Sequence, residues 1–265
     1  MFLIHSMAHF SSIYLPVLKM TGARKICEIG SELGGNTSIL LEYADGNHGH
    51  IICIDPCPDS NFYEKLINKE NISFIKDKSI NAICTINCID VWFVDGDHNW
   101  YTVFNELSLI DEVSKRDGKP FLAFVHDVDW PSGRRDLYYD PSSIPENFLH
   151  DYSWELGTVP EQADLISGGF RGAGAFAWAH QSGGEKNGVR TAIEDFITDG
   201  RVDEVEFLSI PGVFGLGVIV SKNHPFLKEI KSLLAPFANN PLLIDLEKNR
   251  LENYLELIRR QDEGN

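Results

Sequence analysis

The sequence is short of basic residues and contains no long apolar run. Lys and Arg number 23 against 39 Asp and Glu, which gives a formal net charge of -16 at pH 7. Such a surface repels phosphate backbones and anionic lipids, and no basic patch of any length offsets it. No segment approaches the roughly 20 apolar residues that span a bilayer. We therefore expect neither nucleic acid nor a membrane as a partner.

Signals for export and for zinc binding are also missing. The five cysteines are an odd number, and their two close pairs are spaced C-x-x-x-C rather than the C-x-x-C of zinc sites. Buried free thiols in a reducing compartment are the simpler explanation. Residues 1–22 lack a basic leader and predict an amphipathic helical lead-in rather than a secretion signal. We expect a cytoplasmic protein.

Short apolar runs alternate with helical patterns through the first half of the chain. This alternation predicts βαβ units, and the strands lack polar alternation, as expected where helices cover both faces. The sequence therefore predicts an α/β fold: a Rossmann-like, doubly wound, mostly parallel sheet with helices on both faces. The predicted strands are 25–29, 50–55, 72–77, 88–95 and 120–127, and the predicted helices between them are 36–44, 62–68 and 100–114.

The pattern changes after the fifth predicted strand. Residues 129–184 show no long periodic segment but are rich in aromatic residues and glycine, so we expect a long lid insertion that covers substrate. A helix at 187–198 follows, then antiparallel strands at 205–210 and 214–221 joined by a Pro-Gly turn, and a helical segment at 225–261. We expect all 265 residues to form one domain, whose terminal helical segments offer a surface for a homo-oligomer.

A glycine-rich turn follows the first predicted strand in the stretch EIGSELGGNT. Glycines there let backbone amides approach a ligand at the carboxyl edge of the sheet. About twenty residues on, Asp55 ends the second predicted strand, where an acid accepts hydrogen bonds from ribose hydroxyls. The alternative is an ordinary strand-to-helix turn. The dinucleotide pattern G-x-G-x-x-G is absent, and Glu28 and Glu32 are poor neighbours for a pyrophosphate.

The form E-x-G-x-x-x-G together with Asp55 resembles the class I methyltransferases that use S-adenosylmethionine (SAM). The resemblance implies that SAM binds at this turn, and that Asp77 and the weaker candidate Ser79 lie near its adenine. For Asp77, a solvated turn is the alternative. The cofactor-binding candidates are Glu28, Gly30, Ser31, Gly34, Asn36, Thr37, Asp55, Asp77 and Ser79.

The fourth and fifth predicted strands end in D-G-D-H and H-D. Asp95, His126 and Asp127 therefore share the carboxyl edge of the sheet, where they are candidate ligands for a divalent metal, Mg²⁺ or Mn²⁺. A metal lowers the pKa of an acceptor hydroxyl, and His98 is the candidate general base. The alternatives are salt bridges from the two aspartates to Arg134 or Arg135, and a purely structural His98. We assign Asp97 to the cap of the helix that begins near Asn99.

This arrangement is similar to a subgroup of that family, the metal-dependent O-methyltransferases of sugars, macrolides and related natural products. The resemblance extends over residues 20–130. It implies that Asp95 is a metal ligand, that His98 is the base, and that His126 and Asp127 occupy the position of an acidic pair. His126 stands where a carboxylate is more usual.

The lid begins with WPSGRRDLYYD. Arginines bind carboxylates and phosphates, while tyrosine and tryptophan stack on rings, so we expect substrate contacts here. Alternatively, the arginines pair with Asp136 and Asp140. The expected function is SAM-dependent O-methylation of a small polyhydroxylated acceptor; the rival hypotheses are an NAD-dependent oxidoreductase and a catalytically inactive binding protein. The candidate substrate residues are Trp130, Arg134, Arg135, Tyr138 and Tyr139.

Overall fold

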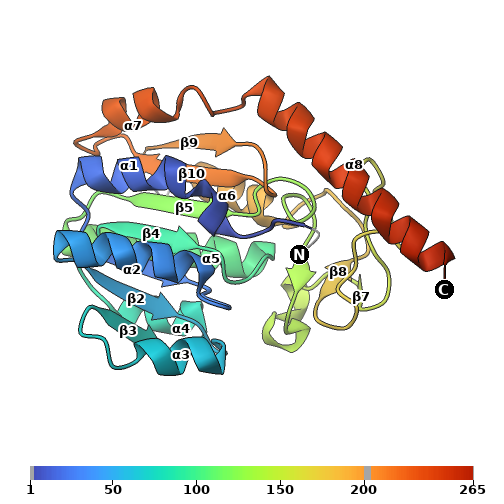
Figure 1. Ribbon diagram of the computed structural model, residues 1–265, viewed down its shortest axis with the longest axis horizontal. Helices are drawn as coiled ribbons and strands as arrows, with labels where there is room; N and C mark the ends of the chain where they lie inside the picture. Colours follow the sequence, from blue (N-terminus) through green and yellow to red (C-terminus); the bar gives the residue numbers. More distant parts are fainter. Residues whose placement is uncertain (1–2, 200–203, 265) are drawn as a thin grey trace.

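The computed structural model describes residues 3–199 and 204–264, and a seven-stranded sheet forms its centre (Figure 1). The strand order is β3-β2-β1-β4-β5-β10-β9. Strands β1 to β5 are mutually parallel, so their carboxyl ends share one edge. The strands are β1 (Lys25–Ile29), β2 (His50–Ile54), β3 (Ile72–Ile75), β4 (Val91–Val94), β5 (Leu122–His126), β9 (Val205–Ile210) and β10 (Leu216–Ser221).

Helices cover both faces of this sheet, as the sequence predicts. One core cluster joins α1, α2 and α7 to one face, and a second joins α4, α5 and α6 to the other. Both faces of the strands are therefore buried, which explains their continuous apolar sequences. The helices are α1 (Ser11–Thr21), α2 (Gly35–Asn47), α3 (Ser60–Leu66), α4 (Ser79–Ala82), α5 (Trp100–Asp117), α6 (Val189–Thr198), α7 (Leu227–Leu234) and α8 (Pro241–Glu263), with short 3₁₀ turns η1 (Met7–Phe10) and η2 (Ile83–Thr85).

The last two strands confirm the predicted antiparallel end of the sheet. β10 pairs antiparallel with both β5 and β9. Between them the turn at 211–215 places Val213 and Phe214 at positive φ angles of 46° and 66°. This turn lies at the carboxyl end of β5, close to the predicted site.

The lid contains regular structure that its sequence does not reveal. Strands β6 (Leu137–Tyr138), β7 (Tyr152–Ser153) and β8 (Ala177–Ala179) form a small antiparallel sheet of order β6-β8-β7, with 3₁₀ turns η3 (Pro141–Ser143) and η4 (Glu146–Phe148). The strands are only two or three residues long, too short for periodicity to show. Aromatic contacts anchor the lid instead, such as the rings of Phe170 and Trp178 at 5.9 Å.

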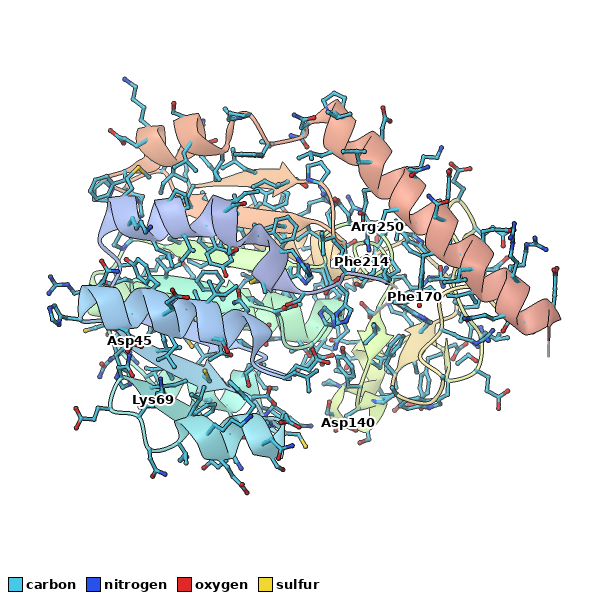
Figure 2. The ribbon with its side chains drawn as sticks, viewed as in Figure 1. Asp45, Lys69, Asp140, Phe170, Phe214 and Arg250 are labelled. Carbon is cyan, nitrogen blue, oxygen red and sulfur yellow. The ribbon has the colours of Figure 1, made fainter. Side chains whose placement is uncertain are left out.

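Helix α8 crosses the outer side of the lid (Figure 1). It is 23 residues long, yet Leu251 is its one buried residue within the described chain. Figure 2 shows Phe170 of the lid, Phe214 and Arg250 of α8 gathered at the crossing, with the Arg250 guanidinium 4.9 Å from the Phe214 ring. Across the described ranges, no helix combines the length and the apolar character that a bilayer span requires.

Candidate active site

Three side chains from two strand ends converge at the carboxyl edge of the sheet. Asp95 follows β4, Asp127 follows β5, and His98 lies between β4 and α5. One ligand atom from each lies within 4.8 Å of the others, the spacing of a metal-binding group. The parallel pairing of β4 with β5 brings the two aspartates together, as the sequence predicts.

The imidazole of His98 is buried without a hydrogen bond. Its Nε2 lies 2.7 Å from Oδ2 of Asp127 and 3.6 Å from Oδ1 of Asp95. The alignment suits neither contact, so both ring nitrogens lack a hydrogen-bond partner within the described chain. Burial alone would lower the pKa of His98, but the charges of Asp127 and Asp95 raise it to about 10. A buried imidazole facing two carboxylates supplies the ligand types of a cation site, although Nε2 already forms an ion pair with Asp127.

His126 has a different role from the one its position suggests. Its Nε2 lies 2.8 Å from the carbonyl oxygen of Val213, and its Nδ1 lies 3.0 Å from Asp95 and 3.3 Å from Asp127. Since Nε2 donates to the carbonyl, Nδ1 faces the two carboxylates. Their charges raise the pKa of His126 against the opposing effect of burial. The geometry makes His126 a bridge between the aspartates, where the sequence predicts a metal ligand.

Asp127 is held in an uncommon backbone conformation. Its φ angle is 59°, in the left-handed region, which aspartate tolerates better than most residues. Burial acts against ionisation, but His126 and His98 hold the pKa of Asp127 well below its usual range. In this conformation the carboxylate points toward the imidazoles of His98 and His126, and these contacts offset the strain of the backbone.

Tyr139 is the predicted substrate residue that the structure places at this cluster. The backbone N–H of Leu137 donates to the carbonyl of His98, which ties the lid to the strand end. The Tyr139 ring lies 5.8 Å from the His98 ring and remains half exposed. Desolvation of its hydroxyl and the charges of Asp127 and Asp95 raise the pKa of Tyr139. An accessible aromatic ring therefore borders the carboxylates.

The glycine turn lies directly against the end of β4. Gly30 has a φ of +83°, and a side chain there would overlap the backbone of Asp95 and Gly96. Gly34, at +76°, would overlap the ring of Phe62 if it carried a Cβ. Both positions therefore require glycine, and the turn is in contact with the acid cluster.

Asp55 holds this turn in place. Its carboxylate accepts from the Ser31 N–H at 2.8 Å, the Ser31 hydroxyl at 3.0 Å, the Glu32 N–H at 3.0 Å and the Cys57 N–H at 2.8 Å. Three of these donors share Oδ2, and the Cys57 N–H alone reaches Oδ1. Each carboxylate oxygen offers about two acceptor positions, so Oδ1 can still accept from a ribose hydroxyl while the turn stays intact.

Three of the predicted cofactor residues are instead structural. Glu28 accepts from the side chains of Asn36, at 2.9 Å, and Thr37, and the Tyr14 hydroxyl donates to Asn36 at 2.6 Å. Burial raises the pKa of Glu28 to about 7. The group clamps the start of α2 to β1 beneath the turn. The sequence motif identifies Glu28, Asn36 and Thr37 as part of the turn, but it does not show that their side chains point inward.

The two residues expected near an adenine also have internal partners. Asp77 is exposed and accepts from the Lys78 N–H at 2.7 Å and from the Asn81 side chain at 2.9 Å. These contacts agree with the alternative of a solvated turn. The hydroxyl of Ser79 donates to Glu106, a buried residue of α5. Burial raises the pKa of Glu106 to about 8, and its Oε2 has no hydrogen-bond partner within the described chain. The helical pattern of 100–114 gives no signal for this acid.

The cap of α5 differs from the prediction. Asn99 is the N-cap, since its side chain accepts from the Thr102 N–H at 2.8 Å. Asp97 accepts from the side chains of Asn99, at 2.7 Å, and Thr102, at 3.0 Å. Asp97 thus fixes the cap rather than forming it, because the helix begins at Trp100, two residues too late for Asp97 to be the N-cap.

The lid arginines bind the protein itself. Arg134 forms a bidentate pair with Glu194 at 2.6 and 2.7 Å. Arg135 is buried and donates to the carbonyls of Ala179, His180 and Ala163. The two arginines thus bind neither the expected substrate nor Asp136 and Asp140, the alternative partners. The arginines therefore hold the lid together.

The other lid candidates are similarly engaged. The Tyr138 hydroxyl donates to Asp136 at 2.8 Å, and Asp136 also accepts from the backbone of Trp100 and Gly188. Trp130 packs near Phe170, with ring centroids 6.0 Å apart, and lines a cavity beside α8. The buried role of Asp136 cannot be predicted from the sequence, because an acid beside two arginines resembles a surface ion pair.

Residues 27–128 match the family model of a methyltransferase domain. This segment, less than half of the chain, is similar to that family. The match begins in β1 and ends just beyond β5, so it includes the glycine turn, Asp55 and the acid cluster. The lid and the helices after it lie outside the match. A search of curated proteins returned no significant match.

Solved methyltransferase structures resemble this chain at low sequence identity. The O-methyltransferase TomG from Streptomyces achromogenes is 14% identical, with 82% of this chain and 80% of that chain covered and a TM-score of 0.48. An O-methyltransferase from Bacillus cereus is 14% identical, with 82% of each chain covered and a TM-score of 0.45. The methyltransferase PaMTH1 from Podospora anserina is 13% identical, with 79% and 76% covered and a TM-score of 0.45.

Proposed function

We propose that the protein transfers a methyl group from SAM to a hydroxyl of a small polyhydroxylated acceptor. The observation that carries the proposal is the convergence of Asp95, His98 and Asp127 in contact with the glycine turn of a methyltransferase domain. Methyl transfer is an in-line displacement, so the acceptor oxygen must be aimed at the methyl carbon. Two carboxylates beside the turn supply acceptors for the hydroxyls of a polyol.

The cluster fits a divalent metal held by Asp95, His98 and Asp127. Two carboxylates and one imidazole are ligands that Mg²⁺ and Mn²⁺ accept, and one ligand atom from each lies within 4.8 Å of the others. A divalent ion would lower the pKa of an acceptor hydroxyl. This assignment makes His98 a ligand and leaves His126 to orient the two carboxylates.

The lid completes the site through Tyr139. Its half-exposed ring lies beside His98, where it can stack on the face of a sugar ring and exclude water from the reacting oxygen. Its hydroxyl stays protonated and can donate to an acceptor oxygen, because the surrounding carboxylates raise its pKa.

A direct test measures S-adenosylhomocysteine formation with a panel of sugars and glycosylated natural products, with added Mn²⁺ and with a chelator. We expect Asp95→Asn and Asp127→Asn to abolish turnover and Mn²⁺ binding while SAM affinity remains. Asp140→Asn, in an exposed lid carboxylate, is the matched control. Equal turnover with and without the chelator would remove the metal from the proposal.

Calorimetry with SAM and with NAD separates this function from its rivals. The methyltransferase match and the absence of G-x-G-x-x-G favour SAM. NAD binding without SAM binding would support an oxidoreductase. SAM binding without turnover on any acceptor, while the acid cluster retains Mn²⁺, would support an inactive binding protein.

A further inference from the structure

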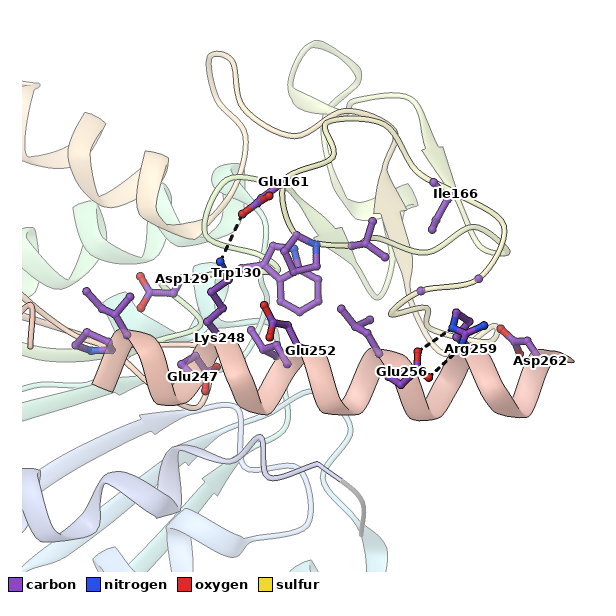
Figure 3. Close-up of a pocket in the computed structure, with 18 of the residues that line it drawn as sticks. Asp129, Trp130, Glu161, Ile166, Glu247, Lys248, Glu252, Glu256, Arg259 and Asp262 are labelled. Atoms are coloured by element: carbon purple, nitrogen blue, oxygen red, sulfur yellow. Dashed lines mark hydrogen bonds and ion pairs between the residues drawn. The ribbon is translucent and has the colours of Figure 1, made fainter. Parts of the chain in front are cut away.

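A large cavity lies away from the acid cluster. It has a volume of about 1130 Å³ and lies between α8 and the lid segment 159–169 (Figure 3). None of Asp95, His98 and Asp127 lines it. Small-molecule sites typically occupy roughly 300–1,000 Å³, so the cavity is large enough for a ligand of its own.

One face of α8 looks into this cavity. Its lining residues recur at three- and four-residue intervals, as expected for one side of a helix. The apolar members include Ile244, Leu251 and Leu255, and Ile244 remains 49% exposed. A surface helix normally buries such a stripe against the protein. Here Leu251 is buried but Ile244 stays exposed, and Trp130 and Ile166 lie on the lid side of the cavity.

The charges around the cavity select for a cation. Seven carboxylates line it, against three basic side chains. Each of the three bases has a carboxylate partner: Arg190 with Asp129 at 2.6 Å, Lys248 with Glu161 at 3.9 Å, and Arg259 with Glu256 at 2.8 Å. An anionic ligand would therefore have to break an existing ion pair.

Glu252 is the carboxylate without an ion pair among the described residues. The other α8 carboxylates that line the cavity have partners: Glu247 pairs with Arg250, Asp262 with Arg171, and Glu256 and Glu263 with Arg259. Figure 3 shows Glu252 pointing from α8 toward the lid side of the cavity, where Trp130 lies. A free carboxylate and an indole that line the same cavity are both groups that attract an ammonium group.

We propose that this cavity is a second binding site, for an organic cation with an apolar body. The apolar stripe of α8 and Trp130 cover the body of the ligand, and Glu252 receives its ammonium group. The cavity is separate from the acid cluster, because none of Asp95, His98 and Asp127 lines it, although Glu247 contributes to both the cavity and the turn that supports His126.

The test compares three probes that share a phenylalkyl body and carry a cationic, a neutral and an anionic head group: 4-phenylbutylamine, 4-phenylbutanol and 4-phenylbutyrate. Calorimetry on the full chain should show that the amine binds most tightly and the butyrate most weakly. Glu252→Gln should weaken amine binding about threefold to fivefold, as expected for an exposed charge pair, and leave the alcohol unaffected. Leu255→Gln should weaken both.

Glu229→Gln is the matched control, since it removes one exposed carboxylate from α7 and changes the net charge equally. It should leave all three affinities unchanged. Circular dichroism of each variant checks that the fold is retained. The proposal is overturned if no probe binds, if the three probes bind equally, or if Glu229→Gln weakens amine binding as much as Glu252→Gln does.

Discussion

Glu28 offers the sharpest test of how the glycine turn is held. It is 1% exposed and carries a pKa raised from 4.5 to about 7, first by burial and further by the charge of Asp95, while hydrogen bonds from Thr37 and Asn36 act in the opposite direction. Replacing it with glutamine keeps the shape and removes the charge. The structure predicts that Glu28→Gln stabilises the protein at neutral and alkaline pH.

The sign follows from the direction of the shift. Above pH 4.5 the unfolded chain releases this proton before the folded chain does, so stability falls with rising pH until the folded group ionises near pH 7. One pKa unit corresponds to about 1.4 kcal/mol, so the full cost in the wild type approaches roughly 3 kcal/mol above pH 7. Glutamine does not ionise and avoids this cost.

Urea unfolding at several pH values between about 5.5 and 8.5 measures the difference. The advantage of Glu28→Gln should grow as the pH rises to about 7 and then level off. Glu112→Gln, an exposed neutral substitution on α5, controls for the loss of one charge from an acidic protein. A variant less stable than wild type at pH 8.5, or a difference that does not vary with pH, would refute the reasoning.

Three further predictions concern the turn, the lid and α8. SAM binding should slow amide exchange at Ser31, because a ribose held by Asp55 stabilises the turn in which the Ser31 N–H donates to the same carboxylate; mass spectrometry measures this, and unchanged or faster exchange would contradict it. Arg135→Met should lower the free energy of unfolding by about 3 kcal/mol, since buried carbonyls lose their donors; urea unfolding measures it. Glu247→Gln should cost about 2 kcal/mol and weaken Mn²⁺ binding, whereas Glu252→Gln should leave Mn²⁺ binding intact.

The central sheet could be predicted because its strands are short apolar runs separated by helical patterns. The strand at 25–29 agrees fully with β1. The fourth prediction began too early: β4 spans Val91–Val94, while Cys88 has a φ of 52° and the Asp90 side chain accepts from the backbone of Lys25. Cys88 and Ile89 lie in a turn, but because they are apolar they extend the hydrophobic pattern that predicts the strand.

The acid cluster could be predicted only in part. Strand order alone brings Asp95 and Asp127 to one edge, but the direction of each side chain depends on residues far along the chain. His126 bridges the aspartates because a carbonyl at Val213 fixes its other nitrogen. Likewise, Glu28 belongs to a ligand motif by sequence, yet it turns inward because Thr37 and Asn36 donate to it.

The last helix thereby becomes part of the support of the acid cluster. The Glu247 carboxylate of α8 accepts from the N–H groups of Val213 and Phe214, each at 3.0 Å, and Arg250 holds that carboxylate at 2.6 Å. These bonds stabilise a turn with two residues at positive φ, and the Val213 carbonyl then fixes His126. Because His126 faces both carboxylates, the spacing of Asp95 and Asp127 depends on α8, which lies outside the matched methyltransferase segment.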